Sequence, residues 1–182
     1  VIYDTDEHVR KEAKPEDFSK LRPAFKKDGS VTAGNASGIN DAGAAVVLME
    51  AGAAAQSGVE PHARLVAYAH AGVEPHIMGE GPIPAVQKVF QKAGLKPSDM
   101  DVVESNEAFA VQAMTVTKQL GLDPARVNPN GGAVALGHPI GATGAILTVK
   151  CLYELQRTGG KYGLVTMCIG GGQGIAAIYE RL

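Results

Sequence analysis

The feature that most constrains the fold is an alternation of short apolar runs with amphipathic stretches that end at glycine. Residues 64–72 (RLVAYAHAG) form a short, mainly apolar run, and residues 101–105 (DVVES) contain two adjacent valines; both are predicted to be buried strands. Residues 82–95 and 109–121 carry apolar side chains at helical spacing and then reach a glycine, which suits the left-handed residue that closes a helix. Strands that alternate with helices predict an α/β fold.

The last quarter of the chain extends this pattern with a long helix and a hairpin. Residues 142–160 form the longest helical stretch and also end at glycine. Residues 161–182 hold two apolar runs around three glycines, which predicts an antiparallel hairpin. A hairpin added to alternating strands and helices predicts a mixed β-sheet covered by helices. The 23 glycines gather at such turns and do not form a low-complexity region.

The first third of the chain is less regular. Residues 1–30 are charged and predict loop, with one short helix opening at Pro15. Residues 44–49 (AAVVLM) form a short apolar run, which predicts another buried strand. The stretch from residue 50 to 57 then predicts a helix that ends at Gly58.

Charge and composition argue against several classes of function. The net charge of −2 shows no excess of basic residues of the kind that binds nucleic acid or an anionic membrane. No apolar run reaches the roughly 18 residues of a membrane span. Cys151 and Cys168 have neither metal-ligand spacing nor a disulfide framework, so we expect no metal site and a cytoplasmic location. Because the sequence begins with Val1 instead of Met, we expect the C-terminal part of a longer protein.

His138 lies in the glycine-rich stretch NPNGGAVALGHPIGATGA, residues 128–145. Pro139 favours an extended histidine and is well placed to start the long helix. His138 would then sit at the helix N-terminus, where the dipole disfavours the imidazolium form. A neutral imidazole can accept a proton, so His138 is a candidate general base. A structural histidine that hydrogen-bonds the loop is the alternative.

Cys168 and Asn106 each follow or end a predicted strand. Cys168 precedes three glycines, so a substrate could reach the thiol and glycine N–H groups could bind an oxyanion. The alternative is a buried cysteine that acts as a small apolar residue, which is also how we interpret Cys151 in its helix. Asn106 is predicted to open the following helix, so its amide either caps that helix or points into the cleft at the strand ends.

Taken together, these segments resemble the thiolase family of acetyl-CoA acetyltransferases and β-ketothiolases, in particular the bacterial biosynthetic type. The resemblance covers essentially the whole chain and implies the C-terminal half of a layered αβαβα architecture. Residues 1–40 would end a loop domain, residues 41–60 would supply the last strand and helix of the N-terminal domain, and residues 61–182 would form the C-terminal domain. The motifs that carry it, in the family's order, are TAGNASGIND, GPIPA, VESNEAFA, NPNGGAVALGHPIGATGA and CIGGGQG.

The resemblance implies reversible Claisen condensation and thiolysis of acyl-CoA. Two acetyl-CoA molecules would give acetoacetyl-CoA and coenzyme A, or a slightly longer 3-ketoacyl-CoA would form. Coenzyme A and acyl-CoA would be substrates, with no permanently bound cofactor. The family's acylating cysteine lies in the N-terminal half, so that half would be the chain's partner and the chain alone would be inactive. A homo-oligomer, dimer or tetramer, is also implied.

The resemblance assigns roles residue by residue. His138 matches the base that activates the acylating cysteine, and Cys168 matches the second cysteine, an acid/base at the enolising carbon. Asn106 matches the asparagine that holds a water at one oxyanion hole, which His138 shares, and the N–H of Gly170 matches the second hole. The positions that match coenzyme A and acyl contacts are Ser37 at the pantetheine arm, Arg10 and Leu21 at the adenine end, and Met78, Ala108 and Phe109 along the acyl tunnel.

The chain departs from the family pattern at two places. The chain has Asn40-Asp41-Ala42-Gly43 where the family commonly has N-D-G-A, so we expect the local turn to differ. Ser105 replaces a commoner alanine before Asn106, and we expect it to change the position of that asparagine.

Two rival functions are a Cys168–His138 thioester hydrolase and a coenzyme A or acyl-CoA binding module without turnover.

Overall fold

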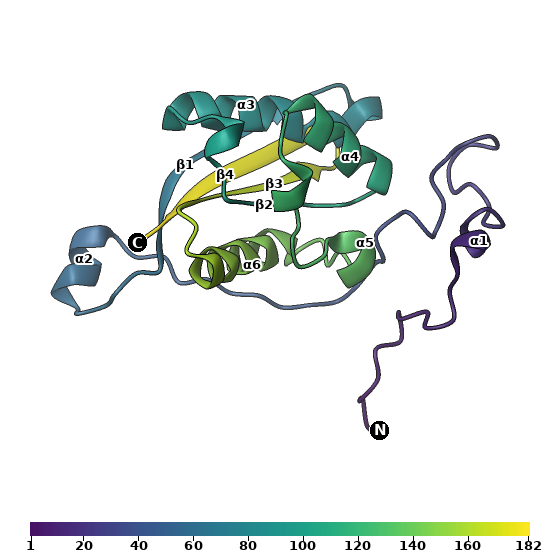
Figure 1. Ribbon diagram of the computed structural model, residues 1–182, viewed down its shortest axis with the longest axis horizontal. Helices are drawn as coiled ribbons and strands as arrows, with labels where there is room; N and C mark the ends of the chain where they lie inside the picture. The colour runs from purple at the N-terminus through teal and green to yellow at the C-terminus, as the bar shows by residue number, and fades with distance from the viewer.

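The computed structural model describes residues 1–182 and contains a four-stranded sheet with helices on both faces (Figure 1). The strands lie in the order β1-β4-β3-β2. β1 and β3 pair antiparallel with β4, whereas β2 and β3 are parallel, so the sheet is mixed as predicted. The bounds are β1 Ala63–Gly72, β2 Val102–Ser105, β3 Tyr162–Ile169 and β4 Gln173–Arg181.

Helices α3 (Pro82–Ala93) and α4 (Ala110–Gln119) cover one face of the sheet, and α6 (Thr143–Thr158) covers the other (Figure 1). All three helices were predicted near these bounds, because their apolar residues recur at helical spacing. The shorter helices are α1 Pro15–Phe18, α2 Ala51–Gln56, α5 Ala133–Leu136, and the 3₁₀ helices η1 Pro75–Glu80, η2 Pro97–Asp99 and η3 Pro124–Arg126. None of the helices combines the length and apolarity that crossing a bilayer would need.

Two separate apolar clusters form the core, one on each face of the sheet. The larger cluster packs α3 and α4 onto one face and includes Val86, Val89, Val103, Val116, Leu164 and Ile178. The smaller cluster lies under α6, and Cys151 is its fully buried centre. Burial raises the pKa of the Cys151 thiol to about 12, so this thiol is not nucleophilic at neutral pH. The interpretation of Cys151 as a packing residue is confirmed.

Residues 44–49 do not form the predicted strand. The segment is irregular, with Val47 91% and Leu48 78% exposed. A strand needs the backbone hydrogen bonds of a neighbouring strand, and residues 44–49 make no backbone hydrogen bond to the sheet. The helix after it does form, as α2, and Glu50 caps it by accepting a 2.9 Å hydrogen bond from the N–H of Ala53.

The hairpin between β3 and β4 is tight because glycines occupy its turn. Gly171 and Gly172 have φ angles of 83° and 89°, which favour glycine over other residues. A Cβ on Gly172 would lie 2.3 Å from the carbonyl oxygen of Val73, so this turn also packs closely against the end of β1. The turn places Cys168 and Gly170 at one end of the sheet.

Candidate active site

The parallel pair β2 and β3 brings two predicted site residues to the same edge of the sheet. Asn106 follows β2 directly, and Cys168 lies one residue before the end of β3. Because the strands are parallel, their carboxyl ends meet, which is where α/β sheets bind ligands. The N–H of Asn106 donates to the carbonyl of Thr166 at 2.9 Å, and Asn106 is 1% exposed. Its position is therefore set by the sheet.

His138 reaches the same edge from the other side of the fold. Its Nε2 lies 3.3 Å from Nδ2 of Asn106, and its Nδ1 lies 2.7 Å from the Thr143 hydroxyl. That hydroxyl donates to the carbonyl of Pro139 at 2.9 Å, so it accepts from Nδ1–H of the ring. The Asn106 amide donates, so Nε2 is the unprotonated nitrogen. The arrangement selects a neutral tautomer whose basic nitrogen faces Asn106.

Burial favours the neutral form of the His138 ring. The pKa of His138 is lowered by desolvation of the half-buried imidazole. The prediction that Pro139 begins the long helix is wrong, because α6 begins at Thr143, five residues after His138. The N–H groups of Ala142 and Thr143 both donate to the Pro139 carbonyl, and this turn precedes the helix.

The prediction that Asn106 opens a helix is also wrong. Helix α4 begins at Ala110, and its N-cap residue is Phe109. The alternative is therefore the observed one, since the Asn106 amide turns toward His138 at the strand edge. The Oδ1 atom of Asn106 is buried without a hydrogen-bond partner in the protein, and a donor such as a water would satisfy it.

Cys168 and Gly170 lie near the turn between β3 and β4. Cys168 is 8% exposed, and burial raises the pKa of its thiol, so the thiol is neutral in this chain. No hydrogen bond joins Cys168 to His138 or Asn106. A Cβ added to Gly170 would meet no atom within 4 Å, so there is open space beside this part of the backbone.

Residues 36–40 pair with Phe109 and His138 and include Ser37, a predicted substrate-binding residue. Ala36 forms an antiparallel bridge with Phe109, and Ile39 forms a parallel bridge with His138. The N–H and the hydroxyl of Ser37 both donate to the carbonyl of Ala108, at 3.1 and 3.2 Å. Ser37 therefore lies against Ala108 and Phe109, and the same segment continues to His138.

The remaining predicted residues lie farther from this centre or make fewer contacts. Leu21 packs near Gly34, where a Cβ would lie 2.7 Å from the Leu21 side chain. Met78 lies half-buried in η1, and Arg10 is exposed and forms no ion pair. No group of three or more His, Cys, Asp or Glu side chains is placed to hold a metal ion.

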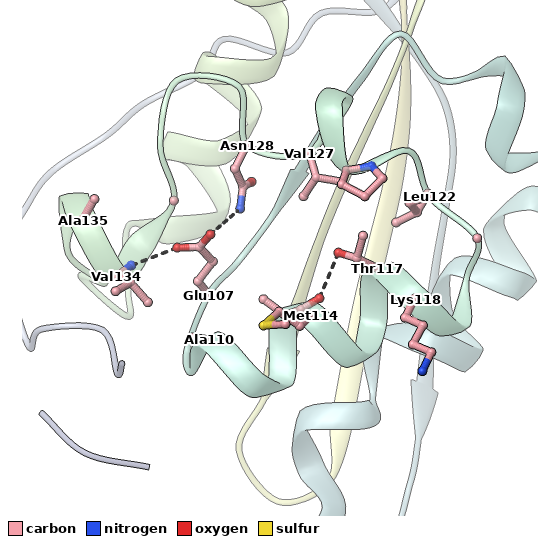
Figure 2. Close-up of a pocket in the computed structure, with 14 residues that line it drawn as sticks. Glu107, Ala110, Met114, Thr117, Lys118, Leu122, Val127, Asn128, Val134 and Ala135 are labelled. Atoms are coloured by element: carbon pink, nitrogen blue, oxygen red, sulfur yellow. Dashed lines mark hydrogen bonds between the residues drawn. The ribbon is translucent and has the colours of Figure 1, made fainter. Parts of the chain in front are cut away.

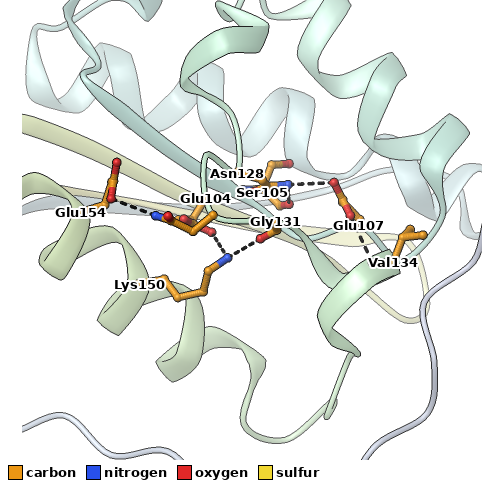
Figure 3. A network of polar contacts seen from close by, with 9 residues as sticks. Glu104, Ser105, Glu107, Asn128, Gly131, Val134, Lys150 and Glu154 are labelled. Atoms are coloured by element: carbon orange, nitrogen blue, oxygen red, sulfur yellow. Dashed lines mark hydrogen bonds and ion pairs between the residues drawn. The ribbon is translucent and has the colours of Figure 1, made fainter. Parts of the chain in front are cut away.

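Sequence reasoning missed three residues that support the site. Thr143 orients the His138 ring, as described above, and Phe25 packs edge-on against Phe109 with ring centroids 5.6 Å apart. Asn128 holds the strand end, because its amide bonds to both the N–H and the carbonyl of Ser105 at 2.9 Å (Figure 3). The GHPIGAT motif contained Thr143, but the contact with the ring depends on the turn at Pro139.

A cavity of about 780 Å³ lies beside the site, between α4 and residues 127–135. Figure 2 shows Glu107 at one end, where its carboxylate accepts hydrogen bonds from the Asn128 amide and the Val134 N–H. The lining is mainly apolar and includes Met114 and Leu122. None of the residues predicted for catalysis or substrate binding lines this cavity. The candidate catalytic residues therefore lie at the strand ends and not around this cavity.

Two family models together match nearly the whole chain. The family described as thiolase, C-terminal domain, matches residues 59–181, and the thiolase N-terminal domain matches residues 1–52. Beta-ketothiolase BktB of Cupriavidus necator is 64% identical over 183 residues, covering 100% of this chain and 46% of that protein. The acetyl-CoA acetyltransferase of Allochromatium vinosum is 57% identical over 181 residues, with the same coverage.

Solved structures share the fold of this chain. The acetyl-CoA acetyltransferase of Bacillus anthracis matches with a TM-score of 0.94 and 50% identity, covering 100% of this chain and 46% of that one. Human mitochondrial 3-ketoacyl-CoA thiolase in complex with CoA matches with a TM-score of 0.89 and 47% identity, covering 97% and 45%. The chain spans about half the length of these relatives. The predicted fold class is confirmed, and the division at residues 1–40, 41–60 and 61–182 stays a prediction.

Proposed function

Because the chain belongs to the thiolase family, we propose that it forms the C-terminal part of a β-ketothiolase. The reaction is the reversible condensation of two acetyl-CoA molecules to acetoacetyl-CoA and coenzyme A, or of a slightly longer acyl-CoA with acetyl-CoA. The observation that carries this proposal is the contact between His138 and Asn106, which leaves a basic ring nitrogen at the strand edge.

In the first half-reaction, His138 is the general base. Its Nε2 accepts the proton of an acylating cysteine supplied by the N-terminal half of the enzyme. The resulting thiolate attacks the thioester carbonyl, and an acyl–enzyme thioester forms. The C–S bond to coenzyme A breaks and its sulfur takes the proton of the Cys168 thiol, while His138 keeps the proton of the acylating cysteine. The lowered pKa of His138 supports this role, because a neutral ring can accept a proton near neutral pH.

In the second half-reaction, Cys168 removes a proton from the α-carbon of the second acetyl-CoA. The enolate oxygen accepts hydrogen bonds from the Nε2–H that His138 gained in the first half-reaction and from a water bound to Asn106. The carbanion attacks the acyl group, a C–C bond forms, and the other cysteine leaves and takes its proton back from His138. The N–H of Gly170 lines the hole for the oxygen of that acyl group. The thiol of Cys168 is buried and neutral in this chain, so the complete site must stabilise its thiolate before it can act as a base.

The proposal also assigns the substrate contacts, the cellular location, the oligomeric state and the use of the product. Ser37 lies along the pantetheine arm, Met78, Ala108 and Phe109 lie along the acyl tunnel, and Arg10 and Leu21 lie toward the adenine end. The enzyme works in the cytoplasm as a homodimer or homotetramer. Its 3-ketoacyl-CoA product enters fatty acid metabolism or polyhydroxyalkanoate biosynthesis.

The test joins this chain to the N-terminal half of the Cupriavidus necator relative, as a mixture and as a covalent fusion. Neither half alone should cleave acetoacetyl-CoA with coenzyme A, whereas the combined protein should. Disappearance of acetoacetyl-CoA gives the rate, and intact-protein mass shows the acyl group on the N-terminal half.

The two rival functions predict different results. A Cys168–His138 thioester hydrolase would turn over acyl-CoA with this chain alone and carry the acyl group on Cys168. A binding module would bind acyl-CoA in calorimetry, and the combined protein would show no thiolysis. Either result would refute the proposed function.

A further inference from the structure

The residues proposed for proton transfer come from two separate segments of the chain. Asn106 follows β2 directly, whereas His138 follows residues 128–137, a loop that includes the one-turn helix α5. Their 3.3 Å contact therefore depends on how this loop is held against the sheet and α6. The backbone of His138 itself is held by residues 36–40, since its N–H donates to the Gly38 carbonyl at 3.1 Å.

Lys150, on α6, links the loop of residues 128–137 to strand β2. Its Nζ donates to Oε2 of Glu104 at 2.7 Å and to the carbonyl of Gly131 at 2.6 Å (Figure 3). The Lys150 side chain is 19% exposed, and the Glu104 side chain is completely buried. Glu104 lies two residues before Asn106, so both side chains project from the same face of the strand.

Neighbouring contacts hold the start of the same loop. Asn130 donates to Oε2 of Glu154 on α6 at 2.8 Å, and Asn128 is bonded to the backbone of Ser105. Lys150 is the one residue that contacts both the loop and a side chain of β2 from within α6. Its loss would free the Gly131 carbonyl, which precedes the turn into α5 and His138.

We propose that Lys150 is a positioning residue for His138 and Asn106, because its ammonium ties the Gly131 carbonyl of the histidine loop to the buried Glu104 carboxylate of the asparagine strand. Lys150 hydrogen-bonds neither His138 nor Asn106 and acts through the loop and Glu104. This inference rests on the proposed function, which gives the His138–Asn106 contact its chemical importance.

The test measures the His138 ring directly and needs no turnover. The 182-residue chain is labelled with ¹⁵N-histidine, and a His138→Gln variant identifies the His138 signals among the five histidines. The unsubstituted chain should show a single neutral tautomer, with Nδ1 protonated and Nε2 free. Lys150→Met should lose this signature and give a mixture of tautomers. Lys150→Arg should keep it, because a guanidinium can also donate to both oxygens.

A double variant separates positioning from simple stability. Replacing a buried ion pair with apolar residues of similar volume is often neutral for stability, so Glu104→Leu with Lys150→Met should unfold near the melting temperature of the unsubstituted chain. Its ring should still show mixed tautomers, because the Gly131 carbonyl has no partner. The matched control is Lys92→Met, which removes another helix lysine that donates to a backbone carbonyl, that of Tyr68 at 3.0 Å. The control should leave the ring unchanged.

Several outcomes would overturn the inference. A single Nδ1-protonated tautomer in Lys150→Met, or its recovery in the double variant, would show that the ion pair does not position the ring. A double variant that fails to fold would show that the pair serves the fold itself.

Kinetics add an independent measurement in the combined enzyme. Lys150→Met should lower kcat by about 10–100-fold, with KM for acetyl-CoA changed less than about 2-fold, because displacement of the base affects the transition state more than substrate binding. If the unsubstituted combined enzyme is inactive, the proposed function fails, and the ring measurement still decides the role of Lys150.

Discussion

Gly163 allows α6 to pack directly on the sheet, and we predict that Gly163→Ala destabilises the protein. A Cβ at this position would lie 2.2 Å from Sγ of Cys151 and 3.0 Å from Cδ1 of Leu155, whereas ordinary contact begins at 3.4 Å. Gly163 is not among the residues with positive φ, so the added methyl group strains only the packing. The expected effect therefore measures how closely the helix approaches β3.

The magnitude follows from two opposing effects. Overpacking a core costs about 1–3 kcal/mol, and a clash of more than 1 Å with a completely buried sulfur places Gly163→Ala near the upper end. Replacing glycine within a strand regains about 0.5–1 kcal/mol of backbone entropy. We expect a net loss of about 2 kcal/mol, or a melting temperature lower by about 4–8 °C in a chain of this size.

Cys151→Ala should relieve the clash. Alone, this change should cost about 1 kcal/mol, because it removes one buried atom from the cluster under α6. Combined with Gly163→Ala, it should bring stability to within about 1 kcal/mol of the unsubstituted chain, a coupling of about 2 kcal/mol between residues in contact.

Urea unfolding of the four proteins provides the double-mutant cycle. Gly72→Ala is the matched control, since a Cβ at this strand glycine would meet only one atom, at an ordinary 3.8 Å. It should not reduce stability. An unchanged unfolding midpoint for Gly163→Ala, or additive losses in the double variant, would refute the assigned packing of α6.

The remaining predictions concern the site and its support. In the combined enzyme, His138→Ala should prevent acylation by acetyl-CoA, whereas Cys168→Ser should acylate and then stall before condensation; the reverse pattern in intact mass would show that the roles are exchanged. Asn106→Ala should lower the condensation rate by about 10²–10³-fold, and a loss under tenfold would remove it from the oxyanion hole. Hydrogen bonds from Arg157 and Asn130 lower the pKa of Glu154 to about 2, so its stabilising contribution should be complete above pH 4.5 and disappear toward pH 2. The difference in urea midpoint between the unsubstituted chain and Glu154→Gln should therefore shrink over that range, and a constant difference would contradict this assignment.

Local sequence patterns predicted most of the regular structure. Helices α3, α4 and α6 and the strands of the terminal hairpin were predictable because each has apolar residues at its own period and a glycine where the chain must turn. The motifs around His138, Asn106 and Cys168 also identified the family. Such signals lie within one segment, so the sequence alone contains them.

Tertiary structure decided the features that depend on separate segments meeting. Residues 44–49 have the composition of a strand but remain irregular, because a strand also needs a neighbour for its backbone hydrogen bonds. The tautomer of His138 depends on Thr143 and Asn106, which approach the ring from opposite sides. The pairing of Lys150 with Glu104 joins residues 46 positions apart, and no local pattern marks such a contact. Sequence periodicity therefore determined the elements, while packing between them determined which polar groups lie within hydrogen-bonding distance and in which protonation state.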